Sequence, residues 1–410
     1  MHKESWIDQN MHYGLGCFCF IIADSFLRSL FIESGFLKWH DFLLRSKHRK
    51  SVRFLRMEPC KMDKSHKRKK CMEETKRRKY SLNKKAAAAA LIILALVIGL
   101  VLIEENRSFW KTSSPVVTET TAEVPKEFAR ACDHAGTVQR IDYPAKDYTS
   151  GEKVTKPAYV YLPYGYDETE QYDVLYMMHG WQMRAQDFLE QPVQIKELFD
   201  HLIDSGMTRP FIAVCLTFDA KNEPQSYERS VEEFAQFHLE LRNDAMPYLE
   251  SQLATYADEP SLKGLKASRN HRAFAGFSMG AITAWHQFLF NLDLLRGYVI
   301  MSGNCWILGN NGGKNQPVKT VNALVKTIHK GWYKLTDYFI YACAGTSDPL
   351  YPDMDPQIQE MMKRQEFSGD NMIYALKEGG YHDLNAVREY LYNALPRIFP
   401  GDSPKISKEE

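Results

Sequence analysis

The sequence contains few cysteines, and they form no pattern that would organise a metal site or a disulfide framework. Four of the eight cysteines follow residue 103, namely Cys132, Cys215, Cys305 and Cys343. No CxxC pair and no cysteine–histidine cluster with metal-ligand spacing is present. Cys215 and Cys343 stand in strongly apolar runs, so we expect small buried hydrophobic side chains there. We therefore predict no zinc site, no disulfide network and no other metal or cofactor.

The sequence also lacks internal repeats. No self-similar period of about 20 to 50 residues is present, which argues against solenoid and propeller folds. Apolar residues make up 44% of the chain and charged residues 25%, the balance of an ordinary globular protein. With 410 residues, the chain can form one large catalytic domain with appendages, or two or three small domains.

Charge is distributed unevenly, although the formal net charge is only +1. Residues 1–85 contain 21 Lys/Arg and 9 Asp/Glu, which leaves 31 and 42 for residues 86–410. A basic head of net charge +12 therefore precedes an acidic body of net charge −11. The clusters "KRKK" (67–70) and "KRRK" (76–79) resemble a nuclear-localisation or nucleic-acid patch. Their position ahead of an apolar run explains them more simply, and we expect no nucleic-acid partner.

Charge is completely missing from Ala86 to Ile103, "AAAAALIILALVIGLVLI". As a helix this run is long enough to cross about 30 Å of hydrocarbon. Because the basic clusters lie on its amino-terminal side, the positive-inside rule predicts a cytoplasmic head and an extracellular remainder. A buried core helix and a cleavable signal peptide are the alternatives. No small-x-small cleavage site follows in "EENRSFWKTSS", which favours an uncleaved transmembrane signal anchor over residues 86–103.

The segment "GLGCFCFIIADSFLRSLFI" in the basic head is apolar but contains Asp24 and Arg28. A second membrane span would bury both charges at about 2.5–3.5 kcal/mol each. We expect instead a segment that is disordered or lies on the membrane surface, within a poorly ordered head of residues 1–85. A translation start at Met72 would give the short basic head typical of signal anchors.

The rest of the chain predicts a spacer, one α/β domain and a short tail. Residues 104–131 are rich in Thr, Ser, Pro and Val without a helical apolar stripe, as in an extended extracellular spacer. Over residues 132–400, continuous apolar runs such as "YDVLYMMHG" and "GYVIMSG" alternate with helical stretches. This alternation predicts a mainly parallel sheet with helices on both faces, and the first two runs, "TVQRIDYPA" and "KPAYVYLPY", predict an antiparallel edge. Residues 401–410 form the C-terminal tail.

Ser278 stands between two glycines in "FAGFSMGA", where a strand-like run gives way to a helical stretch. In a sharp strand-to-helix turn, a serine is exposed with strained dihedral angles, and side chains two residues before or after it would clash. Gly276 and Gly280 occupy these two positions. The pattern predicts a nucleophile at Ser278, with a structural serine in a glycine-rich turn as the alternative.

A serine hydroxyl needs a base within hydrogen-bond reach and an acid that orients the base. On this fold the expected chain order is serine, acid, histidine. Asp348 in "GTSDPLYP" and His382 in "EGGYHDLN" follow the next suitable strands in that order, although singly each could be a turn former or a solvated loop residue. The reserve acids are Asp353, Asp355 and Asp383. Asp383 is adjacent to His382 in sequence, which makes orienting that ring awkward.

Acyl transfer also needs N–H donors for the developing oxyanion. The backbone N–H of Met279, at the start of the helix, is one candidate. The backbone N–H of Trp181 in "MMHGWQ" is the second, because Gly180 allows the chain to turn inward there. His179 could be mistaken for a catalytic base, but its place at the end of an inner strand favours a structural role.

These stretches resemble the carbohydrate esterase family 1 group of α/β-hydrolases, which includes feruloyl and acetylxylan esterases and is related to the esterase D family. The resemblance runs from about Cys132 to Phe399 and implies Ser278, His382 and Asp348 as nucleophile, base and acid. The oxyanion hole it implies is the main chain of Met279 and Trp181. Members often carry several glycines after the His-Gly pair, whereas Trp181, Gln182 and Met183 follow it here. We expect a differently shaped acyl pocket, with Gln182 as a candidate lining residue.

Trp306 in "SGNCWILGNN" is a second pocket candidate, since it could stack on a sugar or an aromatic acid, although core packing is equally plausible for it. Together these features predict a membrane-anchored extracellular serine esterase that releases feruloyl or acetyl groups from plant cell-wall polysaccharide, by analogy with the family. The alternatives are a general short-acyl esterase of esterase D type and a non-catalytic hydrolase-like binding module.

Overall fold

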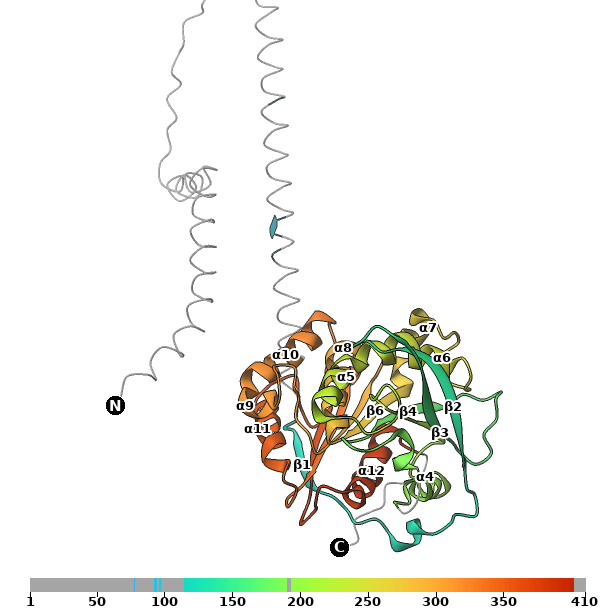
Figure 1. Cartoon of the computed structure of the whole chain (residues 1–410). Coiled ribbons are helices and arrows are strands. Elements are labelled where there is room, and N and C mark those ends of the chain that lie inside the picture. Colours follow the sequence, from blue (N-terminus) through green and yellow to red (C-terminus); the bar gives the residue numbers. More distant parts are fainter. Residues whose placement is uncertain (1–76, 78–91, 94–95, 97–113, 190–192, 402–410) are drawn as a thin grey trace, which may run out of the picture. The chain divides into compact units, whose positions relative to one another are not determined.

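The computed structural model describes residues 114–189 and 193–401, together with residues 77, 92, 93 and 96 (Figure 1). The predicted basic head, most of the predicted anchor and the tail beyond residue 401 lie outside the described residues. No helix among the described residues has the length and apolar character to cross a membrane, so the anchor stays a prediction. The chain divides into two units, Met1–Ile93 and Leu94–Glu410, and the fold is that of the second.

Nine strands form one sheet in this unit, in the order β1-β9-β8-β7-β6-β4-β5-β3-β2. The strands are β1 (Val117–Thr120), β2 (Thr137–Lys146), β3 (Lys153–Leu162), β4 (Asp173–Met178), β5 (Phe211–Leu216), β6 (Arg272–Phe277), β7 (Gly297–Met301), β8 (Phe339–Gly345) and β9 (Met372–Lys377). Only the β2–β3 and β3–β5 pairs are antiparallel. The other strand pairs are parallel. The prediction of a mainly parallel sheet with an antiparallel edge is confirmed.

Helices cover both faces of the sheet, as the continuous apolar strands require. They are α4 (Ile195–Asp204), α5 (Tyr227–Glu240), α6 (Met246–Glu250), α7 (Leu262–Ala267), α8 (Met279–Asn291), α9 (Gly312–Asn315), α10 (Pro317–Lys330), α11 (Tyr351–Met361) and α12 (Leu384–Ile398). In Figure 1, α4 and α12 lie on one side of the sheet and α5, α8 and α10 on the other.

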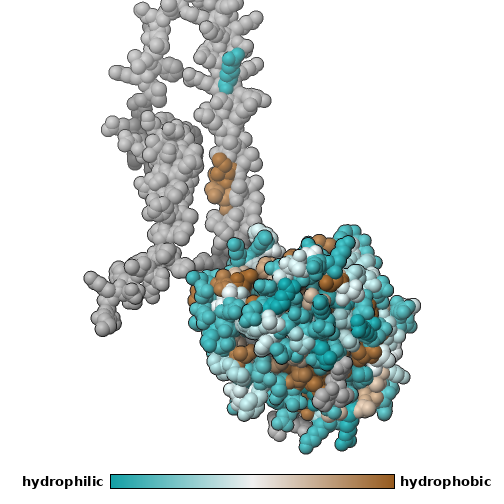
Figure 2. Space-filling model, viewed as in Figure 1, coloured by the Kyte–Doolittle hydropathy of each residue, from teal (hydrophilic) through white to brown (hydrophobic). Residues whose placement is uncertain are grey.

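Every residue of the central strands β4, β5, β6 and β7 is buried, which is typical of parallel strands sandwiched between helix layers. Apolar side chains on the two faces of the sheet form two separate core clusters. The surface seen in Figure 2 is largely hydrophilic, with apolar residues in scattered small areas. The predicted α/β domain is therefore a three-layer structure with one hydrophobic core on each side of the sheet.

Part of the predicted spacer belongs to this sheet, which corrects the expected boundary at residue 132. β1 pairs in parallel with β9, with Val117 opposite Ile373 and Thr120 opposite Leu376. Phe128, also in the spacer range, is buried and stacks on His201 at 4.9 Å between ring centroids. The spacer prediction was wrong here because a four-residue edge strand has no pattern of its own. Its stability comes from pairing with a strand near the other end of the sequence.

The direction of the parallel strands creates two functionally different ends. The strands β4, β6, β7, β8 and β9 all run the same way, so the loops that follow them meet at the carboxyl end of the sheet. This is the end at which α/β sheets bind ligands. The segments that precede these strands meet at the opposite, amino end.

Candidate active site

Ser278 occupies a sharp turn between two regular elements. β6 ends at Phe277 and α8 begins at Met279, and Ser278 between them has φ 57° and ψ −116°. A positive φ is unfavourable for a residue with a side chain and persists only where the surroundings enforce it. The Ser278 N–H donates to the Met301 carbonyl oxygen at 2.9 Å, which ties the turn to β7. The local geometry is that of a nucleophile elbow.

The two glycines around Ser278 are required by space. A Cβ atom on Gly276 would lie 2.0 Å from the Gly280 carbonyl oxygen. A Cβ atom on Gly280 would lie 2.1 Å from the Met178 carbonyl oxygen at the end of β4. Both contacts are too short for any side chain, so the backbone can fold this tightly only with glycine at these positions. The structure thus places Gly276 and Gly280 as the sequence pattern predicts.

The structure brings Ser278, His382 and Asp348 together. His382 Nε2 lies 2.8 Å from Ser278 Oγ, and His382 Nδ1 lies 2.8 Å from Asp348 Oδ2. His382 follows β9 and Asp348 follows β8, so both side chains reach the serine from loops at the carboxyl end of the sheet. This is the hydrogen-bond chain by which a serine, a histidine and an aspartate act in acyl transfer.

The three reserve acids have other partners. The Asp353 carboxylate pairs with Lys314, and an Asp355 oxygen accepts from the Tyr374 hydroxyl. The Asp383 side chain accepts from the Ala386 N–H at 2.9 Å and thereby caps α12. Asp348 is therefore the acid that the structure places against His382.

Hydrogen bonds set the charge of the acid. Burial alone would raise the pKa of Asp348, but hydrogen bonds from His382 and from the Leu350 N–H outweigh it and hold that pKa below its usual range. A charged Asp348 fixes the proton of His382 on Nδ1, which leaves Nε2 to accept the proton of the serine. The Phe277 ring lies 4.5 Å from the imidazole between centroids and covers part of it.

The loop after β4 closes against the nucleophile. A Cβ atom on Gly180 would lie 3.2 Å from the Ser278 Cβ atom, a tight contact, so the backbone at Gly180 lies directly beside the nucleophile. Among the described residues, no protein acceptor is recorded for the backbone N–H of Trp181 or of Met279. Two N–H groups next to a serine hydroxyl match the requirement for an oxyanion hole. The roles of these two groups stay a prediction.

His179 holds the peptide group between Gly180 and Trp181. The fully buried imidazole has Nδ1 at 2.7 Å from the Gly180 carbonyl oxygen and Nε2 at 2.8 Å from Thr217 Oγ1. Because a carbonyl oxygen only accepts, Nδ1 carries the proton and Nε2 accepts from the Thr217 hydroxyl. Burial lowers the pKa of His179 to about 4, so the ring is neutral. This geometry favours a structural role and leaves His382 as the base.

An aromatic rim, which consists of Trp181, Tyr227 and Trp306, lies beside the loop after β4. We call this loop the oxyanion loop. The Trp181 and Tyr227 rings meet edge to face at 5.4 Å, and Tyr227 lies 6.4 Å from Trp306. Trp181 and Tyr227 are about 40% and 36% exposed, whereas Trp306 is half-buried against Phe234. Trp181 follows β4 and Trp306 follows β7, whereas Tyr227 begins α5 after the loop that follows β5. Trp306 thus both packs and borders the exposed surface.

Gln182, the other pocket residue predicted from the sequence, follows the rim residue Trp181 in the chain. Gln182 is exposed with φ 66°, and no side-chain hydrogen bond is recorded for it among the described residues. Tyr227 was not predicted from the sequence. The only sequence feature that could have indicated Tyr227 is its place at the start of a helical stretch, α5, directly after the loop that follows strand β5.

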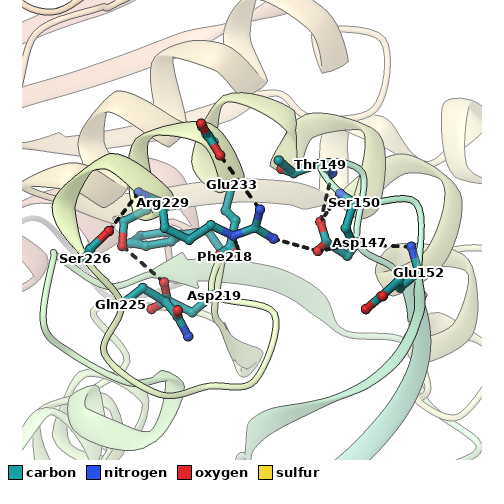
Figure 3. A network of polar contacts seen from close by, with 12 residues as sticks. Asp147, Thr149, Ser150, Glu152, Phe218, Asp219, Gln225, Ser226, Arg229 and Glu233 are labelled. Atoms are coloured by element: carbon teal, nitrogen blue, oxygen red, sulfur yellow. Dashed lines mark hydrogen bonds and ion pairs between the residues drawn. The ribbon is translucent and has the colours of Figure 1, made fainter.

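A polar network holds the start of α5 (Figure 3). The Ser226 side chain caps α5, and the Ser230 hydroxyl lies 3.2 Å from Asp219 Oδ1. Arg229 bridges Asp147 at 2.6 Å and Glu233 at 2.7 Å, and so links the β2–β3 connection to α5. These contacts fix the start of α5 relative to the rim.

Asp219 is the titratable member of this network near neutral pH. The residue is only 1% exposed. Burial, with a further contribution from the negative charge of Glu233, raises the pKa of Asp219 to about 7. The carboxyl group is therefore partly protonated under ordinary conditions. Sequence patterns gave no signal for it.

Within residues 114–189 and 193–401, no group of three or more His, Cys, Asp and Glu side chains is arranged to hold a metal ion. The four cysteines of this part of the chain, Cys132, Cys215, Cys305 and Cys343, are buried free thiols.

Comparison with known protein families identifies the domain. A family model described as "Putative esterase" matches residues 153–399. The chain belongs to this esterase family. The match extends from β3 to the end of α12 and includes Ser278, Asp348 and His382. The resemblance predicted from the sequence is confirmed, and with it the serine esterase class at the level of the family.

Two curated proteins are similar to this esterase domain. "Endo-1,4-beta-xylanase Y" from Acetivibrio thermocellus is 31% identical over 281 residues, which cover 67% of this chain and 24% of that protein. "Endo-1,4-beta-xylanase/feruloyl esterase" from Xylanibacter ruminicola is 30% identical over 271 residues, which cover 64% of this chain and 31% of that protein. The chain therefore matches about a quarter to a third of the length of these relatives.

A solved structure supports the same fold. The feruloyl esterase module from Clostridium thermocellum, a serine-to-alanine mutant complexed with sinapinate, is 29% identical with a TM-score of 0.62. The similarity covers 73% of this chain and 99% of that one. The predicted α/β-hydrolase fold of the esterase domain is confirmed.

Proposed function

We propose that this esterase is anchored at the outer cell surface and releases feruloyl or acetyl groups from plant cell-wall polysaccharide. The observation that carries the proposal is the aromatic rim beside the Ser278–His382–Asp348 chain. Feruloyl groups are flat aromatic acyl groups, and sugar rings also stack on aromatic side chains. Exposed aromatic rings beside the loop that approaches the nucleophile suit an aromatic acyl ester or a sugar ester better than a short aliphatic ester.

Ser278 Oγ attacks the ester carbonyl while His382 Nε2 takes its proton, and Asp348 stabilises the imidazolium that forms. The N–H groups of Trp181 and Met279 donate to the oxyanion. His382 then returns the proton to the leaving sugar hydroxyl, which leaves an acyl group on Ser278. A water molecule activated by His382 releases the acid and restores the serine. This route requires no metal or cofactor.

The relatives support the choice of substrate. One of them is named as a xylanase and feruloyl esterase, and the solved feruloyl esterase module holds sinapinate, an aromatic acid. The location at the outer surface rests on the apolar run 86–103 with its basic amino-terminal flank. A domain held outside the cell would meet polysaccharide directly.

Hydrolysis by purified residues 104–410 of methyl ferulate, acetylated xylan and p-nitrophenyl acetate tests the proposal. We expect cleavage of methyl ferulate or acetylated xylan with a kcat/KM well above that for p-nitrophenyl acetate, and loss of all activity in Ser278→Ala. Preference for p-nitrophenyl acetate alone would favour the esterase D type. If the intact domain cleaved no ester, the binding-module alternative would replace the catalytic one.

A further inference from the structure

Trp332 is an anomaly on the surface of the domain. It is 85% exposed, the highest value among the exposed large apolar side chains that the structure describes. Its φ of 57° lies in the left-handed region, a conformation that glycine usually adopts at the position just after a helix. The Trp332 N–H donates to the His329 carbonyl and the Tyr333 N–H to the Ile328 carbonyl, which is the Schellman motif that ends α10. The backbone therefore holds the indole ring out into solvent.

Several cationic side chains belong to the segments next to this ring. The Arg269 guanidinium lies over the Tyr333 ring at 5.2 Å, and burial together with Arg269 lowers the pKa of the nearby Arg296. Three exposed lysines without a recorded ion pair among the described residues belong to the same segment, namely Lys326, Lys330 and Lys334. Two acids lie in the adjoining segments: Glu366 is buried and pairs with His329, and Asp337 accepts a hydrogen bond from the Lys334 N–H at 2.7 Å.

The position of Trp332 in the fold is opposite to that of the nucleophile. α10 leads back from the carboxyl end of β7, so the loop at Trp332 lies at the amino end of the sheet, just before β8. The described segment 114–189 also begins at this end, where the Ser114 carbonyl oxygen accepts from the Gly369 N–H ahead of β9. His329 Nε2 lies 2.8 Å from Glu366 Oε1, which joins the Trp332 loop to the segment that holds Ser114.

We propose that the docking surface formed by Trp332, Tyr333, Lys330, Lys334 and Arg269 rests on a bilayer that contains anionic lipid. Indole rings favour the headgroup region, and lysine side chains reach lipid phosphates from there. The residues between the apolar run and Ser114, 104–113, span at most about 35 Å, so a domain anchored as in the proposed function, on which this step rests, stays within reach of the membrane. With its amino end on the lipid, the domain turns Ser278 outward toward polysaccharide.

Vesicle co-sedimentation of residues 104–410 tests this proposal. The fragment lacks the apolar run, and the solved module that it resembles is a separate chain matched over 99% of its length. We expect binding to phosphatidylcholine vesicles that contain phosphatidylglycerol, weaker binding to phosphatidylcholine alone, and release by salt. Lys330→Ala and Lys334→Ala should each lower the partition coefficient about fivefold. Trp332→Ala should lower it at least as much.

Matched variants separate docking from folding and from catalysis. Tyr381→Ala removes an aromatic ring that is 66% exposed at the opposite end, and should leave vesicle binding unchanged. Trp332→Ala should keep the wild-type turnover of a soluble ester, and Ser278→Ala should bind vesicles like the wild type. Equal binding by Trp332→Ala and wild type would overturn the proposal. Retention on insoluble xylan that depends on Trp332, without vesicle binding, would also overturn it.

Discussion

His179 Nδ1 donates to the carbonyl oxygen of Gly180 at 2.7 Å, and this bond orients the next N–H of the chain. In a trans peptide, the C=O of Gly180 and the N–H of Trp181 point in opposite directions. A carbonyl held against the buried imidazole therefore turns the Trp181 N–H away from the core, toward the space beside Ser278. His179 is thus a positioning residue for the proposed oxyanion hole.

His179→Asn is expected to lower kcat by about tenfold to a hundredfold, with a smaller change in KM, because the Trp181 N–H loses its orientation. The pH profile of kcat distinguishes this role from that of a base, since its acid limb should remain in place when His179 is replaced. Thr217→Val, which removes only the bond to Nε2, should give a smaller loss. A pH profile without its acid limb in His179→Asn would contradict the positioning role.

Asp348→Asn should lower kcat by about ten-thousandfold, because the neutral side chain no longer holds the Nδ1 proton of His382 or stabilises its charged form. Thermal unfolding should show a folded protein. The matched control is Asp353→Asn, in the same segment but paired with Lys314, and it should keep nearly full activity. Equal losses in both variants would mean that Asp348 acts only through the local fold.

The placement of these residues shows how far the sequence alone leads. Ser278, Asp348 and His382 each follow a strand whose apolar run is visible in the sequence, so the loops that carry them could be predicted to meet at one end. The elbow glycines followed from the lack of space around Ser278 in a sharp strand-to-helix turn. The predictable part of the site is the part that strand order fixes.

The rest depends on contacts between distant segments. β1 is recognisable only through its pairing with β9, and Tyr227 only through the approach of α5 to Trp181. The raised pKa of Asp219 needs burial beside Glu233, which no local pattern encodes. Tertiary packing decides each of these features.

Asp219 should make stability fall as pH rises through the neutral range. Its folded pKa of about 7 lies above the ordinary value of 3.8, so between these values the folded protein binds a proton that the unfolded chain releases. The free energy of unfolding should therefore drop by up to about 1.4 kcal/mol per pH unit from this group, and level off above pH 7. Asp219→Asn cannot titrate and should remove that slope.

Urea unfolding at a series of pH values between 5 and 8 measures this effect. The control is Asp370→Asn, an exposed position, which should keep the wild-type slope. Parallel curves for Asp219→Asn and wild type would show that Asp219 is ionised throughout this range.

Tyr227→Ala should raise KM for methyl ferulate by about tenfold and leave p-nitrophenyl acetate kinetics nearly unchanged. The reason is that the rim loses one exposed ring, while the triad keeps its geometry. Tyr164→Ala removes a ring that is 58% exposed in the β3–β4 connection and should change neither substrate. Equal losses on both substrates would mean that Tyr227 supports the oxyanion loop rather than the acyl group.

Mass spectrometry of the acid-quenched enzyme tests the central claim most directly. Residues 104–410 are mixed with p-nitrophenyl ferulate, and the reaction is stopped within the first turnover. The account predicts a single feruloyl group on Ser278, with none on Ser278→Ala and a longer-lived adduct in Asp348→Asn. Hydrolysis that proceeds without an adduct, or an adduct on another residue, would contradict it.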